Sequence, residues 1–553
     1  MGKTITIRCK NTGRSHKIPI GFTLEEVYEM LEIKMPFEPT SAKVNNKVEG
    51  LHFIFFNDKD VEFLDVTSPS GLRTYTRSLF FVLYKAVRDL YPGARLRIDT
   101  PVSNGYFCQL ETEGGVTPAV VGALKKRMDE IVAENLSFHR ITCPTDEAVA
   151  RFRADGLESK ARLLESCGSL YTTYYTLGDT ADYFYGSLLI KTSQLILFDL
   201  VAYGDGLLLR LPDPKNPHHL MPMTDQPKMF EVFREQHHWQ HILGISTIGE
   251  FNVACNEGHT NDLINVSEAL QEKKISQIAD RIASTPQVKV ILIAGPSSSG
   301  KTTFSKRLAV QLMASGMRPV PISLDDYFVD REDTPRDASG EYDFENVEAM
   351  NIPLFNRQIM ALLKGEEVEL PRYNFQKGKS EPSGNRLRLE PQTLLILEGI
   401  HALNPLLTKD IPQEAKFKIY ASALTSILLD DHNYIPTTDN RLLRRIVRDY
   451  KYRGYSAEET IRRWPSVRAG EEKWIFPFQE EADVMINTAL LFELAALRSQ
   501  ALPLLEQVPE NVPEYSEAYR LRKFLHYLKP ISTDGLPPTS LLREFLGGST
   551  FKY

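Results

Sequence analysis

Hydrophobic and polar residues alternate at the start of the chain. Thr4-Ile5-Thr6-Ile7-Arg8 has a period of two, which predicts a half-buried strand. Residues 23–31 instead combine an N-cap threonine, early glutamates and an apolar stripe, the pattern of a helix. Further strands are expected at Ala42–Val44 and Val61–Leu64, joined through an Asn45-Asn46 turn. Residues 1–66 are therefore predicted to form a small β-rich domain.

Helical periodicity dominates the next part of the chain. Helices are expected at 74–90 and 118–136, which predicts an α+β domain over residues 67–245. Residues 267–282 are charged and amphipathic, and we place a helical linker at 246–285. The tail, 508–553, is expected to hold helices at 515–528 and 540–545. Its Leu541, Leu542 and Phe545 predict docking on another surface, either in the same chain or in a partner.

A buried strand, a glycine-rich loop and a helix follow one another from residue 288. Val288–Ala294 is a short β-branched run, and the nine residues after it, GPSSSGKTT, fit the pattern GxxxxGK(S/T). Glycines let the backbone wrap a phosphate, and the amides at a helix N-terminus supply partial positive charge. Lys301 can reach the β- and γ-phosphates, and the Thr302 hydroxyl can bind Mg²⁺. The predicted ATP-binding residues of this loop are Gly295, Ser297, Ser298, Ser299, Gly300, Lys301, Thr302 and Thr303.

Two further strands end in carboxylates. Residues 318–328 read as a strand followed by Asp325 and Asp326, and residues 393–399 as a buried strand ending at Glu398. Carboxyl ends of parallel strands face the ligand crevice of a doubly wound sheet. Asp325 could there accept the proton of an attacking hydroxyl, and Glu398 is placed for Mg²⁺. The alternative, that these acids cap helices or lie in solvated loops, requires two strands to end this way by chance.

Six segments in a fixed order resemble the uridine kinase and phosphoribulokinase family over residues 288–505. They are the phosphate-binding loop, Ser323–Phe328, Tyr342–Glu345, Pro371–Phe375, Leu397–Gly399, and Arg444–Asp449 with Arg453-Gly454. The resemblance implies an α/β fold, a doubly wound parallel-sheet P-loop kinase domain at 286–507. It also implies that ATP (or GTP) with Mg²⁺ is the phosphate donor.

The front of the chain resembles a different family. The β-β-α-β order of residues 1–66 is similar to the TGS domain, the β-grasp unit that begins threonyl-tRNA synthetases, and residues 67–245 follow the second domain of those enzymes. The metal pattern of that domain, HxxxH with CxxxH, is missing around Arg77 and around Tyr183–Ser187. Aminoacyl-tRNA editing is therefore not expected. The whole order resembles the long bacterial uridine kinase-like proteins.

The kinase resemblance implies roles for individual residues. Asp325 would be the base that receives the proton of the acceptor's 5′-hydroxyl, Glu398 would hold Mg²⁺, and Lys301 would act on the phosphates. Glu345 lies where the family places an aspartate on the ribose hydroxyls. The other implied acceptor-site residues are Tyr327, Phe328, Tyr373, Phe375 and Arg444.

The implied lid over ATP carries Arg448 and Arg453, on an arginine-rich helix whose other interpretation is a solvated basic face. Two features depart from the family. Gly378 replaces a base-contacting histidine, and the arginine–glycine–arginine end of the lid reads Arg453-Gly454-Tyr455. The first bears on the choice of acceptor and the second on the lid contacts.

Composition narrows the class of protein. The 553 residues are 42% hydrophobic and 25% charged, as in soluble globular proteins, and no apolar run is long enough to cross a membrane. Five widely spaced cysteines without a CxxC pair predict neither a disulfide framework nor a thiolate metal site, and favour a cytoplasmic location. A net charge of −7 argues against indiscriminate nucleic-acid binding. His237 and His241, four residues apart within a histidine-rich stretch from His218, have metal-ligand spacing but also suit a polar helix face.

The sequence thus predicts an ATP-dependent kinase that phosphorylates a small-molecule alcohol, with the 5′-hydroxyl of uridine or cytidine as the leading acceptor. A non-nucleoside sugar or polyol is the alternative acceptor, and Gly378 keeps it open. A third interpretation is an RNA-associated regulatory ATPase, and a fourth is a scaffold without activity, which the intact Lys301, Thr302, Asp325 and Glu398 oppose. Homo-oligomers are common among related kinases, but the sequence does not decide the oligomeric state.

Overall fold

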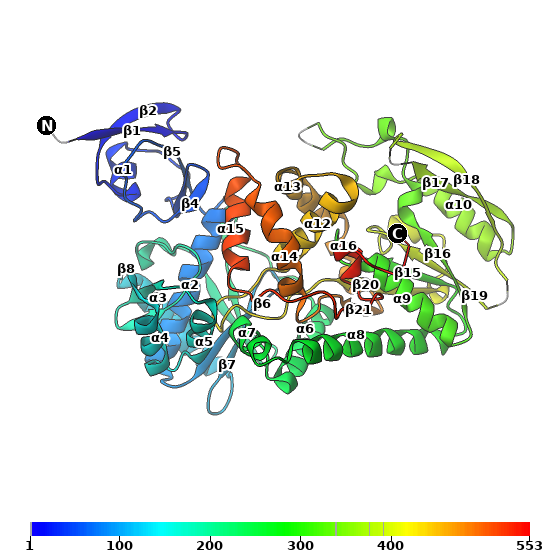
Figure 1. The fold of residues 1–553 in the computed structure, drawn as a ribbon, viewed down its shortest axis with the longest axis horizontal. Coiled ribbons are helices and arrows are strands. Elements are labelled where there is room, and N and C mark those ends of the chain that lie inside the picture. Colours follow the sequence, from blue (N-terminus) through cyan, green and yellow to red (C-terminus); the bar gives the residue numbers. More distant parts are fainter. Residues whose placement is uncertain (1–2, 338–339, 375, 391, 553) are drawn as a thin grey trace.

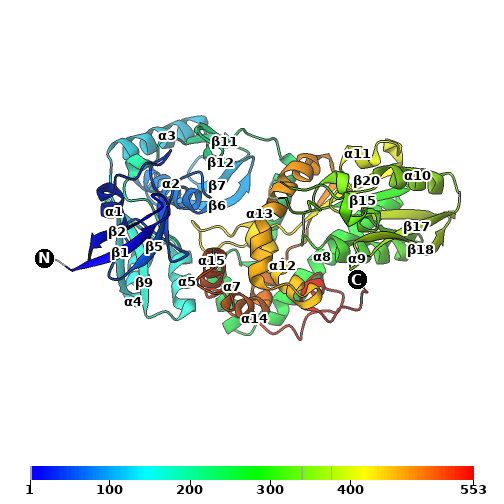
Figure 2. The same ribbon diagram turned by 90° about the horizontal axis from the view of Figure 1, so that it is seen from above.

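The structure is a computed structural model that describes residues 3–337, 340–374, 376–390 and 392–552. Its elements lie in three regions: two N-terminal units at one end, a parallel-sheet unit at the other, and a layer of helices between them (Figures 1 and 2). Among the described residues, no helix is both long and apolar enough to cross a membrane.

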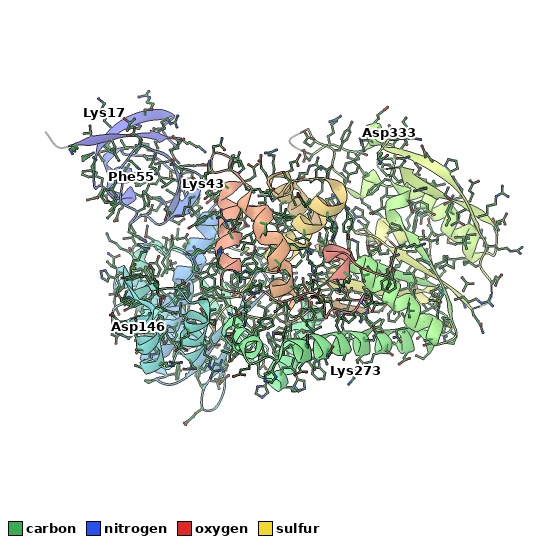
Figure 3. The ribbon with its side chains drawn as sticks, viewed as in Figure 1. Lys17, Lys43, Phe55, Asp146, Lys273 and Asp333 are labelled. Atoms are coloured by element: carbon green, nitrogen blue, oxygen red, sulfur yellow. The ribbon has the colours of Figure 1, made fainter. Side chains whose placement is uncertain are left out.

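The first unit is a five-stranded sheet that holds one helix. The strand order is β2-β1-β5-β3-β4, with β1 and β5 parallel and the other pairs antiparallel. The Thr23 hydroxyl accepts a hydrogen bond from the Glu26 amide, and the Glu26 carboxylate accepts one from the Thr23 amide, so the predicted helix has a complete capping box. Phe55 lies in the core of this unit, whereas Lys17 points into solvent (Figure 3). Its elements are β1 (Thr4–Cys9), β2 (Arg14–Pro19), α1 (Leu24–Met30), β3 (Ser41–Val44), β4 (Lys47–Glu49) and β5 (Lys59–Leu64).

The second unit is built around α2 (Pro69–Leu90), a 22-residue helix with 14 buried residues. A four-stranded antiparallel sheet, β11-β12-β7-β6, and a three-stranded one, β10-β9-β8, complete its architecture. The strands are β6 (Arg95–Val102), β7 (Gly105–Glu111), β8 (Phe138–Pro144), β9 (Tyr171–Leu177), β10 (Thr180–Asp182), β11 (Asp199–Tyr203) and β12 (Gly206–Arg210), with β13 (Pro212–Asp213) and β14 (Asn216–Leu220) as a small separate pair. The helices are α3 (Pro118–Ala133), α4 (Thr145–Ala154) and α5 (Glu158–Cys167).

Three helices lead from this unit to the parallel sheet: α6 (Pro227–Leu243), α7 (Ile248–Asn256) and α8 (Thr260–Ala283). The long α8 runs along one side of the molecule and ends shortly before the first strand of that sheet (Figure 1). Ile275, Ile278 and Ile282 on α8 are buried against the sheet core, which explains the apolar stripe that the sequence shows there.

The C-terminal half carries a sheet of five parallel strands in the order β16-β19-β15-β20-β21. Chain order and sheet order differ, so strand ends from distant segments meet at one edge, as in a doubly wound fold. The strands are β15 (Val290–Ala294), β16 (Arg318–Ser323), β19 (Thr393–Glu398), β20 (Lys416–Ser422) and β21 (Val484–Asn487). Helices α9 (Lys301–Ala314), α10 (Ile352–Leu363) and α11 (Pro405–Thr408), and the hairpin β17 (Val368–Asn374) and β18 (Lys379–Leu387), accompany the sheet. The fold class predicted for this half, and for the units before it, is confirmed.

Helices from the end of the chain lie between the two halves (Figure 2). They are α12 (Thr437–Arg453), α13 (Ala457–Trp474), α14 (Glu493–Glu506), α15 (Tyr515–Leu525) and α16 (Arg543–Leu546). One continuous hydrophobic core joins α2 and its sheet to these helices. Leu541, Leu542 and Phe545 are fully buried, so the tail docks on its own chain. The domain boundaries inferred from the sequence stay predictions, because this core runs across several of them.

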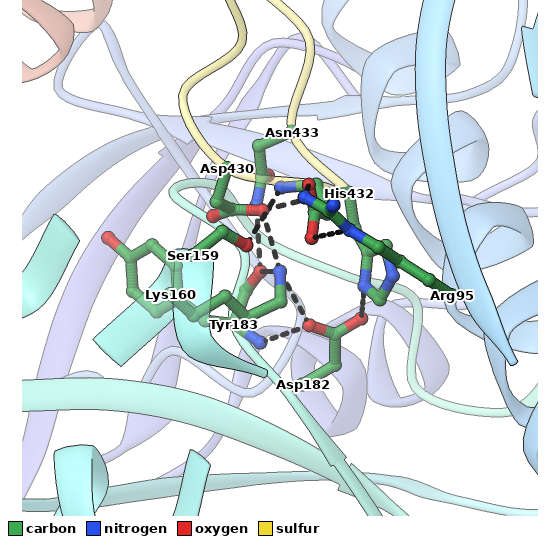
Figure 4. Close-up of polar contacts among 9 residues, drawn as sticks. Arg95, Ser159, Lys160, Asp182, Tyr183, Asp430, His432 and Asn433 are labelled. Carbon is green, nitrogen blue, oxygen red and sulfur yellow. Dashed lines mark hydrogen bonds and ion pairs between the residues drawn. The ribbon is translucent and has the colours of Figure 1, made fainter. Parts of the chain in front are cut away.

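A buried cluster of ion-paired residues joins the segment before α12 to the second unit (Figure 4). The segment 423–436, between β20 and α12, brings Asp430 and His432 against the second unit. Lys160 of α5 lies 2.7 Å from Asp430 and 2.8 Å from Asp182, and His432 Nδ1 lies 2.8 Å from the other oxygen of Asp182. Lys160, Asp182 and Asp430 are each 0% exposed. Burial opposes the charge on Lys160, but the two carboxylates raise its pKa above the ordinary value.

Replacing Lys160 tests this attachment. Lys160→Met removes the cation that pairs with both aspartates and leaves buried carboxylates without that countercharge. We expect the free energy of unfolding to fall by about 3–5 kcal/mol. Urea-induced unfolding monitored by fluorescence measures it.

Lys126→Met provides the matched control. Lys126 is exposed on α3 and lies 3.9 Å from Glu130 one turn later, and such i,i+4 pairs contribute at most about 0.5 kcal/mol. Equal effects of the two substitutions would contradict the role of the buried cluster.

Candidate active site

The loop between β15 and α9 is held in one conformation by close backbone contacts. A Cβ on Gly295 would lie 2.1 Å from the Ala421 carbonyl oxygen, so only glycine fits there. Gly300, at the start of α9, has φ +79°, a left-handed conformation that glycine adopts without strain. Ser297, Ser298 and Ser299 between them are buried. The predicted phosphate-binding loop therefore lies directly at the N-terminus of α9, where amides point outward.

Three predicted residues meet at this helix N-terminus. Lys301 Nζ lies 3.7 Å from Glu398 Oε1, and the Thr302 hydroxyl donates to the same oxygen over 3.3 Å. Glu398 is the last residue of β19, and β19 lies beside β15 in the sheet. A hydroxyl and a carboxylate side by side supply the oxygen ligands that Mg²⁺ prefers, with phosphate oxygens and water completing its shell. Thr302 and Glu398 thus fit the metal that the sequence implies.

Asp325 lies on the adjacent strand end. β16 pairs with β19 so that Ser323 lies opposite Glu398, and Asp325 follows two residues later in a short 3-10 turn. Its carboxylate is exposed, and among the described residues it forms no hydrogen bond or ion pair. The neighbouring Asp326 is engaged, because it accepts a hydrogen bond of 3.2 Å from the Tyr373 amide. Asp325 is therefore the acid of the pair that remains available to a ligand.

Two glutamates near Lys301 have raised pKa values. Burial raises the pKa of Glu398 to about 7, with Lys301 opposing the shift and Asp325 adding to it. Burial also raises the pKa of Glu345 to about 7, with Glu471 as the next cause. Lys301 and Asp325 act on the pKa of both glutamates, so these groups lie within electrostatic reach of one another. Acids with raised pKa values of this kind are common at functional sites.

The segment that carries Glu345 has a second acid, Asp343. Burial raises the pKa of Asp343 as well, but the cation that acts most on it is Lys473 of α13. Glu345 is instead under the influence of Arg445 and then of Lys301. Of these two acids, Glu345 is therefore the one on whose pKa Lys301 acts.

An aromatic group lies beside these acids. Phe328 packs edge-on against Tyr373 and Phe344, with ring centroids 5.7 Å and 5.9 Å apart. Tyr327, predicted at the acceptor site, is instead part of the core, where its hydroxyl donates to Gln358 over 2.8 Å. Phe375 lies outside the described residues.

Gly378 adopts φ +68°, and a Cβ there would lie 2.8 Å from the Arg331 guanidinium. An arginine therefore lies against the position where the family places a histidine. Arg331 and Gly378 are also joined through the backbone, since the Arg331 amide donates to the Gly378 carbonyl over 2.8 Å.

Three arginines of α12 donate hydrogen bonds to the phosphate-binding loop. Arg441 and Arg444 donate to the carbonyl oxygens of Ser297 and Ser298, and Arg445 donates to the Ser297 hydroxyl over 2.7 Å. Arg444 is fully buried, so in this structure it contacts the loop and does not face an acceptor.

The two predicted lid residues share one acid. Arg448 lies 2.8 Å and Arg453 3.5 Å from Asp449. Arg453 is the more exposed of the two, and its electrostatic partners include Asp325.

Sequence reasoning missed two acids that contact the loop. Glu471 of α13 accepts a hydrogen bond of 3.0 Å from the Ser297 amide and pairs with Arg441. Glu544 of α16 accepts bonds from the Thr303 amide and hydroxyl, at 3.2 Å and 2.7 Å. These are amides of the kind that bind phosphate in such loops.

One feature of the sequence pointed toward the contact between Glu544 and the loop. The apolar spacing of Leu541, Leu542 and Phe545 predicted that the tail docks, but it did not identify the target. Once these side chains are buried, Glu544, two residues after Leu542, lies at the loop.

His401, three residues beyond Glu398, was also missed. It is buried, and burial lowers its pKa to about 4. The imidazole is therefore neutral near pH 7, and neither of its ring nitrogens has a hydrogen-bond partner among the described residues.

The histidine-rich stretch takes a different form from a paired metal site. His237 Nε2 lies 2.9 Å from Asp99 Oδ1, and Gln109 lies 3.4 Å from the other ring nitrogen. His218 packs against Phe37, with ring centroids 5.1 Å apart. Each of these two rings is therefore engaged by a neighbour from an earlier part of the chain.

Each half of the chain is similar to known proteins. Residues 290–491 match the model of the "Phosphoribulokinase / Uridine kinase family". The chain is 31% identical to a uridine kinase of Halobacterium salinarum over 196 residues, 35% of this chain and 77% of that protein. It is 30% identical to a uridine kinase of Lactobacillus helveticus over 198 residues, 36% of this chain and 85% of that protein.

The N-terminal part is similar to a threonine–tRNA ligase of Desulforamulus reducens, with 27% identity over 191 residues, 34% of this chain. The match spans only 30% of that ligase. The long architecture, with a synthetase-like front and a P-loop kinase domain behind it, agrees with both sets of relatives. From its kinase half, the chain belongs to the phosphoribulokinase and uridine kinase family.

Proposed function

We propose that this P-loop kinase transfers the γ-phosphoryl group of ATP to the 5′-hydroxyl of a pyrimidine nucleoside. The observation that carries the proposal is the meeting of Lys301, Thr302 and Glu398 at the N-terminus of α9, with the unengaged Asp325 on the next strand end. The uridine kinases among the relatives support uridine or cytidine as the acceptor.

Positively charged groups act on the phosphoryl group, and carboxylates act on the acceptor hydroxyls. Amides of the loop and the Lys301 ammonium offset the negative charge of the transferring phosphoryl group. Asp325 orients the acceptor hydroxyl and takes its proton, while Glu345 accepts hydrogen bonds from vicinal hydroxyls. Tyr373 and Phe328 are buried in the same core as Tyr327, and they support the acceptor side of the site through packing.

Cations surround the phosphates of ATP in the proposed complex. Bound Mg²⁺, held by Thr302 and Glu398, would neutralise phosphate charge. Arg448 and Arg453 close on the phosphates from α12, which excludes water from the reaction.

A second acceptor class follows from Arg331. Its guanidinium lies beside Gly378 and acts on the pKa of Tyr373, so an acceptor with an anionic group, such as a sugar phosphate, would find a countercharge there. A panel of uridine, cytidine, sugar phosphates and simple polyols, assayed for phosphate transfer, separates the two. Turnover on the nucleosides supports the leading proposal. Absence of turnover on every acceptor, with ATP binding intact, refutes both.

Asp325→Asn tests the proton acceptor. An amide cannot take the hydroxyl proton, so kcat should fall by about 10²–10⁴-fold while the affinity for ATP stays within about twofold. Steady-state transfer and equilibrium ATP binding measure the two quantities. Asp333→Asn, at an exposed position in a following turn, is the control and should leave both unchanged. Activity that survives in the Asp325 variant would remove this residue from the mechanism.

Glu345→Gln tests the burial of this acid through pH. The ordinary pKa of 4.5 is raised to about 7 in the folded chain, so the folded state holds a proton that the unfolded state releases between about pH 4.5 and 7. Stability therefore falls as pH rises through this window. Glutamine stays neutral, so the variant should gain about 1–2 kcal/mol over the wild type at pH 8 and little at pH 5.

Thermal unfolding without nucleotide at the two pH values measures the difference. Glu341→Gln, at an exposed position nearby, is the control and should show no pH-dependent gain. The same gain at pH 5 and pH 8 would contradict the raised pKa of Glu345.

Glu544→Ala tests the carboxylate that lies on the loop. Glu544 occupies the Thr303 amide and hydroxyl, and its charge repels an incoming phosphate. Removing it should lower the KM for ATP by about three- to tenfold and change kcat little. Glu506→Ala, at the exposed end of α14, is the control. An unchanged or higher KM in the Glu544 variant would show that the tail does not compete with nucleotide.

A further inference from the structure

A small cavity lies where α6 and α8 meet the end of β21 and the segment that follows β20. Asn440 of α12 and Leu494 of α14 also line it, whereas no residue of the phosphate-binding loop does. Its volume is about 70 Å³. One water molecule occupies roughly 10–15 Å³ of such a cavity, so about five water-sized groups fit inside. The cavity is formed only by the assembled chain, since its walls come from segments far apart in the sequence.

Four residues of the wall carry a buried side-chain oxygen that has no hydrogen-bond partner among the described residues. They are Gln240, Ser267, Thr425 and Asn440, and each residue is 8% exposed or less. Leaving such an oxygen unpaired costs about 1–3 kcal/mol, and native proteins contain few of them. A polar molecule inside the cavity would recover this cost by supplying the missing hydrogen bonds.

The charges of the wall cancel, which favours an uncharged ligand. Among the described residues that line the cavity, the charged ones are Glu235 and Lys274, and they pair with each other at 2.8 Å. A phosphate or another anion would therefore find no free cation there, and a metal ion no free carboxylate.

The unpaired oxygens favour hydroxyl groups on the ligand. Two of them belong to the carboxamides of Gln240 and Asn440, and two belong to the hydroxyls of Ser267 and Thr425. A ligand hydroxyl both donates and accepts, so it can pair with either end of a carboxamide and with another hydroxyl. An amide or an amine matches fewer of these orientations.

Apolar side chains form much of the remaining wall. They include Trp239, Leu243, Leu270, Ile427 and Leu494. Such a surface suits the carbon skeleton of a ligand, and apolar walls with a few polar groups are typical of small-molecule sites. Hydroxyls on a short carbon chain therefore fit both parts of the wall.

We propose that this cavity binds a small polyol of about the size of glycerol. Its hydroxyls pair with Gln240, Ser267, Thr425 and Asn440, and its carbons contact the apolar wall. Binding of the polyol does not depend on the acceptor of the kinase, because no lining residue belongs to the phosphate-binding loop or its acids.

Two residues of the wall are followed directly by residues that contact the phosphate-binding loop. Asn440 precedes Arg441, which donates to the Ser297 carbonyl over 3.0 Å, and Asn487 precedes Thr488, whose hydroxyl donates to another carbonyl of the loop. A polyol that holds Asn440 in place therefore stabilises the contact between α12 and the loop. We expect bound polyol to raise the affinity for ATP, an effect that rests on the proposed function.

The test uses the full chain and the double variant Ser267→Ala/Thr425→Val, which removes two of the unpaired hydroxyls with little change of shape. A thermal melt without ligand checks folding, and the Tm should stay the same or rise because two unpaired buried groups are lost. Titration with glycerol, followed by saturation-transfer-difference NMR, measures binding. Thr4→Val/Ser499→Ala makes the same chemical changes at exposed positions outside the cavity and serves as the control.

We expect the double variant to bind glycerol about tenfold more weakly than the wild type, as for two lost hydrogen bonds, and the control to bind as the wild type does. A cavity that holds water only, so that glycerol does not bind, overturns the proposal. Equal glycerol affinity of the wild type and the double variant overturns it as well.

Equilibrium binding of ATP, with and without saturating glycerol, tests the action on the loop. Glycerol should tighten ATP binding by about fivefold in the wild type and in the control, but not in the double variant. Glycerol binding without a change in ATP affinity would refute this action. Loss of ATP binding in every protein, with glycerol binding intact, would contradict the proposed function and leave the polyol site supported.

Discussion

The buried contact between Lys160 and two aspartates is the constraint on which the arrangement of the molecule depends. Asp430 comes from the segment that joins β20 to α12, so the ion cluster holds the start of α12 against the second unit. Arg95 pairs with the adjacent Asp431, which extends the attachment. Buried charges tolerate little displacement, because each needs its partner at hydrogen-bond distance. The position of α12 is thereby set by the N-terminal half.

This position matters because α12 supports the nucleotide site. Arg441, Arg444 and Arg445 reach the phosphate-binding loop from one helix. The front of the chain therefore does more than precede the kinase half: it packs in one core with the helices that hold the kinase loop. A kinase domain cut out at the boundaries of its family would lose the partners of Asp430 and of Asp439.

Acids from the helical layer and tail contact the same loop. Glu471 and Glu544 engage amides at the two ends of the loop, where a nucleotide would place its phosphates. Both acids lie far from the loop in sequence, and both contacts exist only because α13 and α16 pack over it. In this structure the protein's own carboxylates satisfy groups that phosphate binds, so ligand entry requires an exchange of partners.

The sequence by itself determined the local chemistry. Glycine spacing, a buried strand and the helix after it specify the phosphate-binding loop, and carboxylates at two strand ends specify Glu398 and Asp325, because these signals are short-range. The tertiary structure alone decided what surrounds them. The contact of Glu544 with the loop and the burial of Arg444 and Tyr327 join segments that no periodicity connects. Such contacts depend on how amphipathic faces pack, and many packings are compatible with the same pattern of apolar positions.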